Sequence, residues 1–455
     1  MIYRDAKYYT STGAYTTFYN GADGHFYTVL APQFSYNAQN YQTYLSCLEK
    51  PFIKLCRLRF LQPDGSIAFA LDNNAGNRLS DCFISDGSLS VNLQNGVRRT
   101  CPVTFSNVNG EFDYNVNNIW FGQEIALDEG MILPDGTQFY LQQGVFLITD
   151  PQDAIQPDSR TMTFNLVDKW ANLDGTLYGN LEGTYEVPLR TNIFSPISGL
   201  LADDIGNGRV VDRIPPVYTV YYSNKTQELP NGTVVGLAES PYTLTVEGGG
   251  TYADVILGLN TMINGLVGYD ASGALRIDAS QEDISDKTKP VAWTFSPQRT
   301  SLLGMTYNVK NTEVYNDYIV VGEQLDNYAQ PMARAQNYDP KSDTNINIVG
   351  RKTFREVANG YATTQMCKDL AAFRLKRTTV LQKAVSISSS QILHLQENQI
   401  VEIIRTDKPG APMERHLIQG FSCPLTGTDN MTISAISVND FPDLTITESD
   451  TLANN

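Results

Sequence analysis

The residues that could support chemistry are few and widely separated. The segment 248–253 (GGGTYA) matches the GxGxxA pattern of a dinucleotide-binding loop. That pattern requires a following parallel strand that ends in an acidic residue about 20 positions on. Asp278 comes too late, and only a turn and a single strand follow the helix. We therefore interpret the segment as a flexible entry to a helix.

The sequence predicts no metal site and no cofactor. Neither HExxH nor HxH occurs, and the three histidines are far apart: His25, His394 and His416. His394 belongs to an alternating LHLQ run and is expected on a strand face. Residues 203–208 (DDIGNG) resemble a calcium loop only faintly, because Ile205 and Ile214 occupy the third and twelfth positions, where oxygen ligands are needed.

Enzymatic chemistry is weakly supported. The sequence has no GxSxG motif and no cysteine close to a histidine. Glu124, Asp128 and Glu129 lie close together and are the carboxylates that a cell-wall hydrolase would need. On a strand and its turn, they are expected to face solvent rather than converge. The sequence therefore predicts a protein that is not an enzyme, with a hydrolase as the weakest alternative.

Composition limits the partners. The 455 residues carry a net charge of −16 with a sequence pI near 4.6, which disfavours a surface that grips the phosphates of nucleic acid. Six cysteines without CxxC spacing are expected as buried thiols rather than disulfides: Cys47, Cys56, Cys82, Cys101, Cys367 and Cys423. No signal peptide and no run of 18 apolar residues is present, so no membrane anchor is expected.

The first 45 residues are unusually rich in tyrosine. Nine occur there: Tyr3, Tyr8, Tyr9, Tyr15, Tyr19, Tyr27, Tyr36, Tyr41 and Tyr44. Tyrosine gives a large contact area at low entropic cost, which suits an arm that docks on a neighbouring domain or subunit. The interaction candidates are Tyr8, Tyr9, Tyr15, Tyr19 and Tyr27. Stacking of these rings on sugars is the alternative interpretation.

Most of the remaining chain carries the alternation and turns of β-structure, above all in residues 97–151. Asp-Gly and Asn-Gly pairs tolerate positive φ and close hairpins. The predicted turns are Asp64-Gly65, Asp86-Gly87, Asn95-Gly96, Asp135-Gly136 and Asn231-Gly232. Residues 139–141 and 145–148 are predicted as separate strands. Trp293 and Phe295 are expected to open the second β-domain, and later strands are predicted at 314–322, 399–405, 415–420 and 431–438.

Three longer segments have helical patterns: 196–204, 251–266 and 356–377. In the second, apolar residues recur at helical spacing, Thr251 can cap the first turn, and Gly265 and Gly268 are expected to end the helix. The third ends in basic residues, as the helix dipole favours.

The order of these elements resembles the tail-hub proteins of bacteriophages. The matching features of the first half are Ile119-Trp120, QEIALDEGM, the Pro134-Asp135-Gly136 hairpin, QQGVFLITDP, and a strand that ends in Asp168-Lys169 before a short helix. Those of the second half are a helix followed by GYDASGALRID, then LQENQIVEII, an Ile-x-Gly-Phe strand end, and PLTGTDNMTISA. The resemblance covers residues 47–440 and leaves out the tyrosine-rich segment.

The resemblance implies a mainly β protein in which two β-barrel-like domains of the tail-hub type flank a small α/β domain. The implied division is a tyrosine-rich arm (1–45), a first barrel domain (46–175), an α/β insert (176–290), a second barrel domain with one long helix (291–445) and a tail (446–455). Some tail-associated proteins carry a hydrolase or receptor-binding extension beyond the hub. None is expected here, since the sequence stops at Asn455.

The function implied is structural. Family members act as a homotrimeric hub at the distal end of a phage tail, joining the sixfold tail tube to the threefold tip around a channel for DNA. The expected partners are distal tail or tail tube proteins, the tape measure protein, and tip or fibre proteins, with transient DNA passage and no specific DNA binding. The expected location is the virion, after assembly in the host cytoplasm. A carbohydrate-recognising receptor-binding protein is the main alternative.

Overall fold

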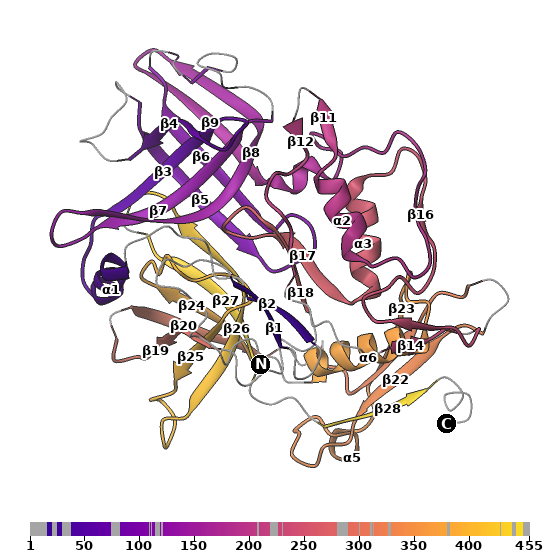
Figure 1. Cartoon of the computed structure of the whole chain (residues 1–455). Coiled ribbons are helices and arrows are strands. Elements are labelled where there is room, and N and C mark those ends of the chain that lie inside the picture. Colours follow the sequence, from indigo (N-terminus) through magenta and orange to yellow (C-terminus); the bar gives the residue numbers. More distant parts are fainter. Residues whose placement is uncertain are drawn as a thin grey trace.

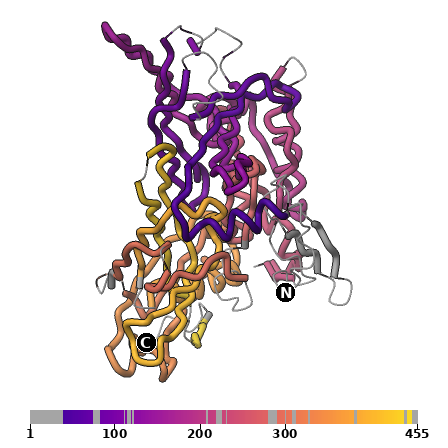
Figure 2. The backbone as a smooth tube through the Cα atoms, turned by 90° about the vertical axis from the view of Figure 1, so that its left-hand side faces the viewer, coloured from indigo at the N-terminus to yellow at the C-terminus, as the bar shows by residue number. Residues whose placement is uncertain are grey.

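A computed structural model gives the fold. It describes residues 16–20, 25–29, 38–73, 82–108, 110, 112–113, 119, 122–206, 209–218, 226–229, 231–279, 290–299, 301–309, 312, 314–325, 329–379, 383–427, 429–438 and 443–448. Two β-regions lie one above the other, and smaller mixed units lie beside them (Figures 1 and 2). The mainly β class predicted from the sequence is confirmed.

Thirteen strands form one sheet, in the order β20-β24-β27-β26-β5-β6-β9-β8-β7-β3-β4, with β25 paired to β26 and β19 paired to β25. The early strands are β3 (Lys54–Leu61), β4 (Ile67–Asp72), β5 (Ile84–Asn92), β6 (Arg99–Ser106), β7 (Glu124–Ile132), β8 (Gln138–Gln156) and β9 (Ser159–Asp168). The late strands are β19 (Val291–Phe295), β20 (Leu302–Val309), β24 (Lys383–Ser389), β25 (Ile400–Ile404), β26 (Met413–Pro424) and β27 (Met431–Ser437). Among the described strands, the sheet does not close into a barrel.

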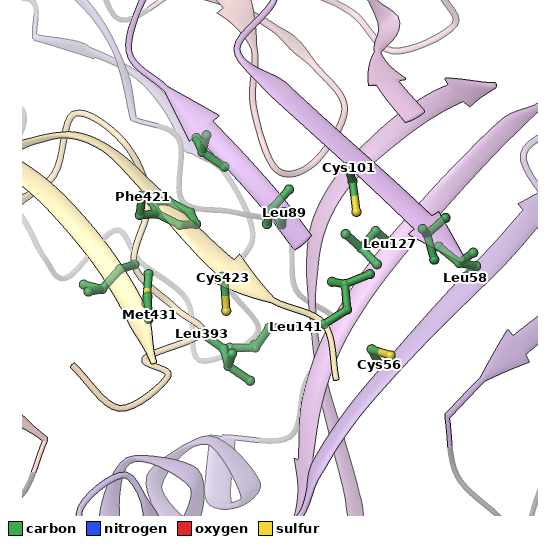
Figure 3. Packing of buried hydrophobic residues seen from close by; sticks show 14 of the residues in the cluster. Cys56, Leu58, Leu89, Cys101, Leu127, Leu141, Leu393, Phe421, Cys423 and Met431 are labelled. Atoms are coloured by element: carbon green, nitrogen blue, oxygen red, sulfur yellow. The ribbon is translucent and has the colours of Figure 1, made fainter. Parts of the chain in front are cut away.

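The pairing of β5 with β26 joins the two β-regions. It runs antiparallel from Gly420 opposite Asn92 to Pro424 opposite Ser88. Behind it, apolar side chains from both regions share one core: Leu58, Leu89, Cys101 and Leu127 from the early strands, and Leu393, Phe421, Cys423 and Met431 from the late segments (Figure 3). Burial of this shared apolar surface therefore holds together segments that lie more than 250 residues apart in the sequence.

Most of the predicted turns agree with the structure, but one turn and one division between strands do not. Gly65, Gly96 and Gly136 have φ of 85°, 90° and 84° and lie in the expected turns. The turn predicted at Asp86-Gly87 is wrong: both residues lie inside β5, where a register shift between Ile84 and Asp86 marks a bulge. The two strands predicted for residues 139–148 are instead parts of the single 19-residue strand β8.

The insert packs around its own core. Its helices are η3 (Lys169–Asn172), α2 (Phe194–Leu201) and α3 (Tyr252–Met262). Its strands are β10 (Tyr185–Val187), β11 (Asp204–Gly206), β12 (Arg209–Val210), β13 (Val217–Tyr218), β14 (Thr226–Glu228), β15 (Val234–Gly236), β16 (Leu244–Val246), β17 (Gly265–Tyr269) and β18 (Leu275–Ala279). The capping role of Thr251 is confirmed, since it forms a capping box with Asp254. The predicted helix end at Leu266 is wrong, because the chain there enters β17.

A second α/β unit interrupts the late β-region, and the sequence did not predict it as a unit. It consists of β21 (Asp317–Val321), β22 (Met332–Asn337), α5 (Ile346–Val349), β23 (Thr353–Val357), α6 (Thr364–Thr379) and β28 (Leu444–Glu448). The strand order is β23-β21-β22-β28, and α6 packs on β21 and β22. The helix expected from Glu356 begins at Thr364, since Glu356 belongs to β23.

The N-terminal segment contributes a hairpin and a helix. The hairpin is β1 (Thr16–Asn20) with β2 (His25–Val29), and the helix is α1 (Ala38–Cys47). None of the described helices is long and apolar enough to cross a membrane.

Gly420 lies in the pairing of β5 with β26 and allows the two strands to approach, so a substitution there tests how far this pairing holds the β-regions together. A Cβ added at Gly420 would lie 2.4 Å from the backbone oxygen of Val91. We expect Gly420→Ala to lower the free energy of unfolding by about 1–3 kcal/mol, as overpacking does. Gly304→Ala is the matched control, because no atom lies within 4 Å of its added Cβ. Denaturant unfolding followed by circular dichroism measures both variants. Equal midpoints for the two would contradict this role of the joint.

Candidate functional site

The tyrosines predicted as interaction residues are only partly described. Tyr8, Tyr9 and Tyr15 lie outside the described residues. Tyr19 and Tyr27 lie on β1 and β2, where their Cα partners are Phe26 and Phe18. Their role in binding stays a prediction.

Two later tyrosines dock α1 between the β-regions. The Tyr44 ring is buried and stacks on Phe139 of β8, with centroids 5.1 Å apart. Its hydroxyl lies 3.0 Å from Nδ1 of His394, and Nε2 of His394 lies 3.2 Å from the Ala292 carbonyl oxygen. A carbonyl only accepts, so Nε2 carries the proton and Nδ1 of the neutral ring accepts from Tyr44. The three-residue spacing of Tyr41 and Tyr44 was the only sequence signal for this contact.

His394 is not on a strand face, as the sequence suggested, but in a turn between β24 and β25. Burial lowers its pKa to about 4, because the charged imidazolium would lose its hydration. The histidine is therefore a neutral structural group at neutral pH.

Five buried charges and the half-buried Arg276 form the main polar site, here called the ionic junction. Its members are Arg98, Arg99 and Asp168 of the early β-region, Arg276 and Asp278 of β18, and Glu397 of the turn before β25. Three arginines thus face three carboxylates. The junction is where the early region, the insert and the late region meet.

Arg99 makes the most contacts in the ionic junction. Its guanidinium forms an ion pair with Glu397, donates to Gln396 Oε1 at 2.7 Å and donates to the Gln143 carbonyl oxygen at 2.8 Å. Its Nε lies 3.4 Å from the Tyr269 carbonyl oxygen, on β17 of the insert. One planar side chain therefore contacts all three parts of the chain, which its fixed fork of donors allows.

Arg98 is held less tightly. Its side chain is fully buried, and Nη1 lies 3.7 Å from Asp278 Oδ2 and 3.9 Å from Glu397 Oε1, beyond hydrogen-bond length. Burial lowers the pKa of Arg98. The backbone amides of Arg98 and Arg99 donate to Asp168 Oδ2 at 2.7 and 2.9 Å, so this carboxylate also fixes the start of β6.

The carboxylates considered for hydrolysis are held in salt bridges. Asp128 and Glu129 are buried rather than facing solvent, which corrects the expectation from the sequence. Arg59 binds Asp128 through both oxygens at 2.6 and 2.7 Å, while Lys54 lies 2.7 Å from Glu129 Oε1. The two carboxylates point to opposite faces of β7, and Glu124 pairs with Arg213 at 2.9 Å. These three groups therefore do not converge on a common substrate position.

The other motifs have structural roles in the described chain. The loop before α3 does not lead into a βαβ unit, because the next strands, β17 and β18, pair antiparallel. No group of three or more histidine, cysteine, aspartate or glutamate side chains that could hold a metal occurs among the described residues. All six cysteines are buried thiols outside any disulfide, as predicted.

A small polar cleft separates the β3–β4 turn from the β11–β12 segment of the insert. Its volume is about 50 Å³, and Gln123, Asn172, Arg209 and Arg213 are among its lining residues. The side-chain amide of Gln123 is buried, and neither of its polar atoms has a hydrogen-bond partner in the described structure. The cleft is large enough for several water molecules, which could reach the amide of Gln123.

The ionic junction can be tested by removing one charge. Glu397→Gln leaves Arg99 without its carboxylate, and we expect a loss of about 3–5 kcal/mol in the free energy of unfolding, as for other broken buried ion pairs. Glu186→Gln, at an exposed position of β10, is the matched control and should change stability by less than about 0.5 kcal/mol. Denaturant unfolding measures both. A loss as small as the control's would show that the junction does not hold the three parts together.

His394 predicts a pH dependence of stability. Its folded pKa of about 4 lies below the ordinary 6.5, so the unfolded chain takes up the proton first as the pH falls. Its contribution is zero above pH 6.5 and destabilises the fold increasingly toward pH 4, by about 3 kcal/mol. In His394→Gln, which keeps one donor and one acceptor, this loss of stability at low pH should be absent. Denaturant unfolding at pH 7 and pH 4.5 gives the change in unfolding free energy for each protein. An equal change in both proteins would contradict the assignment.

The chain resembles known proteins in its fold but not in its sequence. The sequence matches no protein-family model and no curated protein. The structure is similar to a tail protein from Neisseria meningitidis MC58 (TM-score 0.54, 10% identity, 85% of this chain and 97% of that one). It is also similar to the 43 kDa tail protein of prophage MuSo2 from Shewanella oneidensis (0.52, 11%, 84% and 98%) and to prophage tail protein gp18 from Listeria monocytogenes EGD-e (0.50, 10%, 86% and 96%). The resemblance drawn from the sequence is confirmed at the level of the fold: the chain has the fold of phage tail proteins.

Proposed function

We propose that the protein is a structural component of a phage tail, the hub at its distal end. The observation that carries this proposal is the similarity of its fold to three tail proteins over nearly their whole length. In this role the chain joins the sixfold tail tube to the threefold tip as a homotrimer. Its partners would be tail tube or distal tail proteins, the tape measure protein, and tip or fibre proteins.

The two β-regions support a threefold-to-sixfold adaptor. Seven strands of the large sheet come from the early region and six from the late one. We propose that residues 46–175 and 291–445 act as two barrel-like domains, with the α/β insert at 176–290 between them. Three chains would then present six similar units to the tube. The pairing of β5 with β26 fixes the orientation of the two units within each chain.

Charge supports a passage for DNA without binding. The chain carries −16, so a ring of three copies is strongly negative as a whole. A negative channel wall repels DNA phosphates and keeps the genome from adhering as it passes. The protein in this role is not an enzyme and acts in the virion.

The mass and shape of the purified protein test the proposal. We expect light scattering to give three times the 50.4 kDa chain mass, and negative-stain images to show a ring with a central opening. A compact monomer at every concentration would overturn the homotrimer. Binding on a glycan array that is lost on deletion of residues 1–45 would favour the receptor-binding alternative.

A further inference from the structure

The positive charge of this acidic protein is concentrated in one segment. Residues 345–379, which contain α5, β23 and α6, hold seven lysines and arginines against two carboxylates, a net charge of +5. The rest of the chain holds 26 lysines and arginines against 47 carboxylates, a net charge of −21. This segment, rather than the whole second α/β unit, is therefore electrostatically unlike the remainder of the molecule.

The same segment exposes apolar side chains. Ile348 is 65% exposed, Val349 58%, Phe354 38% and Val357 67%, all within ten residues of one another. Single exposed apolar residues are ordinary, but a group of them on two consecutive elements, here α5 and β23, is typical of an interface.

β23 is also an open edge of its sheet. It pairs in parallel with β21 on one side and has no partner on the other among the described strands. The Lys352 carbonyl and the Ala358 amide bond toward β21, to Asn316 and Val321. The two-residue period of a strand therefore turns the backbone groups of the residues between them, at 353, 355 and 357, outward. Such an edge is a template for an incoming strand unless it is blocked or covered.

The cations of this edge are only partly neutralised within the chain. Arg355 is exposed and has no ion-pair partner among the described residues. Arg351 lies 4.0 Å from Asp317 Oδ2, but Arg334 already holds Asp317 with two hydrogen bonds of 2.7 Å. The carboxylate of Glu356 is taken up by Arg374 at 3.1 Å. A net positive charge therefore remains beside the exposed apolar side chains.

We propose that this surface, formed by α5 and β23, is a contact between copies of the chain and receives an acidic face of the neighbouring copy. This inference rests on the homotrimer proposed above. Copies that each carry −16 repel one another, so assembly requires a local surface of opposite charge. Residues 346–357 supply it, since they hold three cations against the single carboxylate of Glu356, and because the remaining chain carries −18, the opposing surface is a different one. A contact between two different surfaces generates a closed ring when its rotation is 120°, as three copies require.

Sedimentation at a series of concentrations tests this contact in the full-length protein. The charge variant is Arg351→Glu with Arg355→Glu. The apolar variant, which changes no charge, is Ile348→Ser with Val357→Ser. The matched control, Lys50→Glu with Lys341→Glu, makes the same charge change at two exposed lysines outside α5 and β23. Thermal melting confirms that each variant is folded.

We expect the wild type and the control to form the three-chain species. The charge variant should associate about 100-fold more weakly, because it brings like charges together at an interface. The apolar variant should associate about 10-fold more weakly through lost burial. Raising the salt from 0.05 to 0.5 M should weaken the association of the wild type, whose contact joins opposite charges, and strengthen that of the charge variant, whose contact joins like charges.

Three results would overturn the inference. If the charge variant forms trimers as tightly as the wild type, the proposed contact is wrong and the proposed hub still stands. If the wild type stays monomeric, both the hub trimer and the contact are wrong. Binding of double-stranded DNA by the wild type that the charge variant loses, with assembly unchanged, reassigns the surface to phosphate binding.

Discussion

The pairing of β5 with β26 is the constraint on which the rest of the structure depends. It makes one sheet from strands that the chain reaches before residue 93 and after residue 412, so both β-regions must be complete before either can bury its apolar face fully. The shared core behind the pair, with buried residues from both regions, has the same consequence. Because contacts of such long sequence separation must close large loops, this joint is expected to form late in folding.

The ionic junction supplies hydrogen-bond partners for backbone groups that become buried where the parts of the chain meet. The insert and the β24–β25 turn both approach the point where β6 begins, and backbone groups there would be buried without partners. Asp168 satisfies the amides of Arg98 and Arg99, and the Arg99 side chain satisfies the carbonyls of Gln143 and Tyr269. Buried ion pairs add little net stability, but they penalise any arrangement in which the partners are missing. The junction therefore specifies the orientation of the parts more than it strengthens them.

The sequence predicted what local physics determines. The turns at Gly65, Gly96 and Gly136 and the Thr251 cap were recognisable, because each depends on neighbours within a few residues. The failures depend on distant partners. Asp128 and Glu129 are acidic residues on a strand that looks solvent-facing, and only the cations of β3 explain their burial. Likewise, Thr353–Val357 became a strand because β21 lies beside it.

The proposed assembly of copies depends on where charge is located within the chain rather than on the net charge. A net charge of −16 suggests copies that stay apart, yet the positive segment at 345–379 lies on a separate unit with an open sheet edge. The core of that unit, with Tyr318, Val320 and Leu370, continues into the late strands through Ile400 and Leu417, whereas the cations in and just before β23 lie exposed on the outside of the unit. Screening by salt limits such a field to about 10 Å. At the separations of copies in contact, local charge therefore outweighs net charge, and in the proposed hub an acidic chain would repel DNA in the channel while attracting its own copies around it.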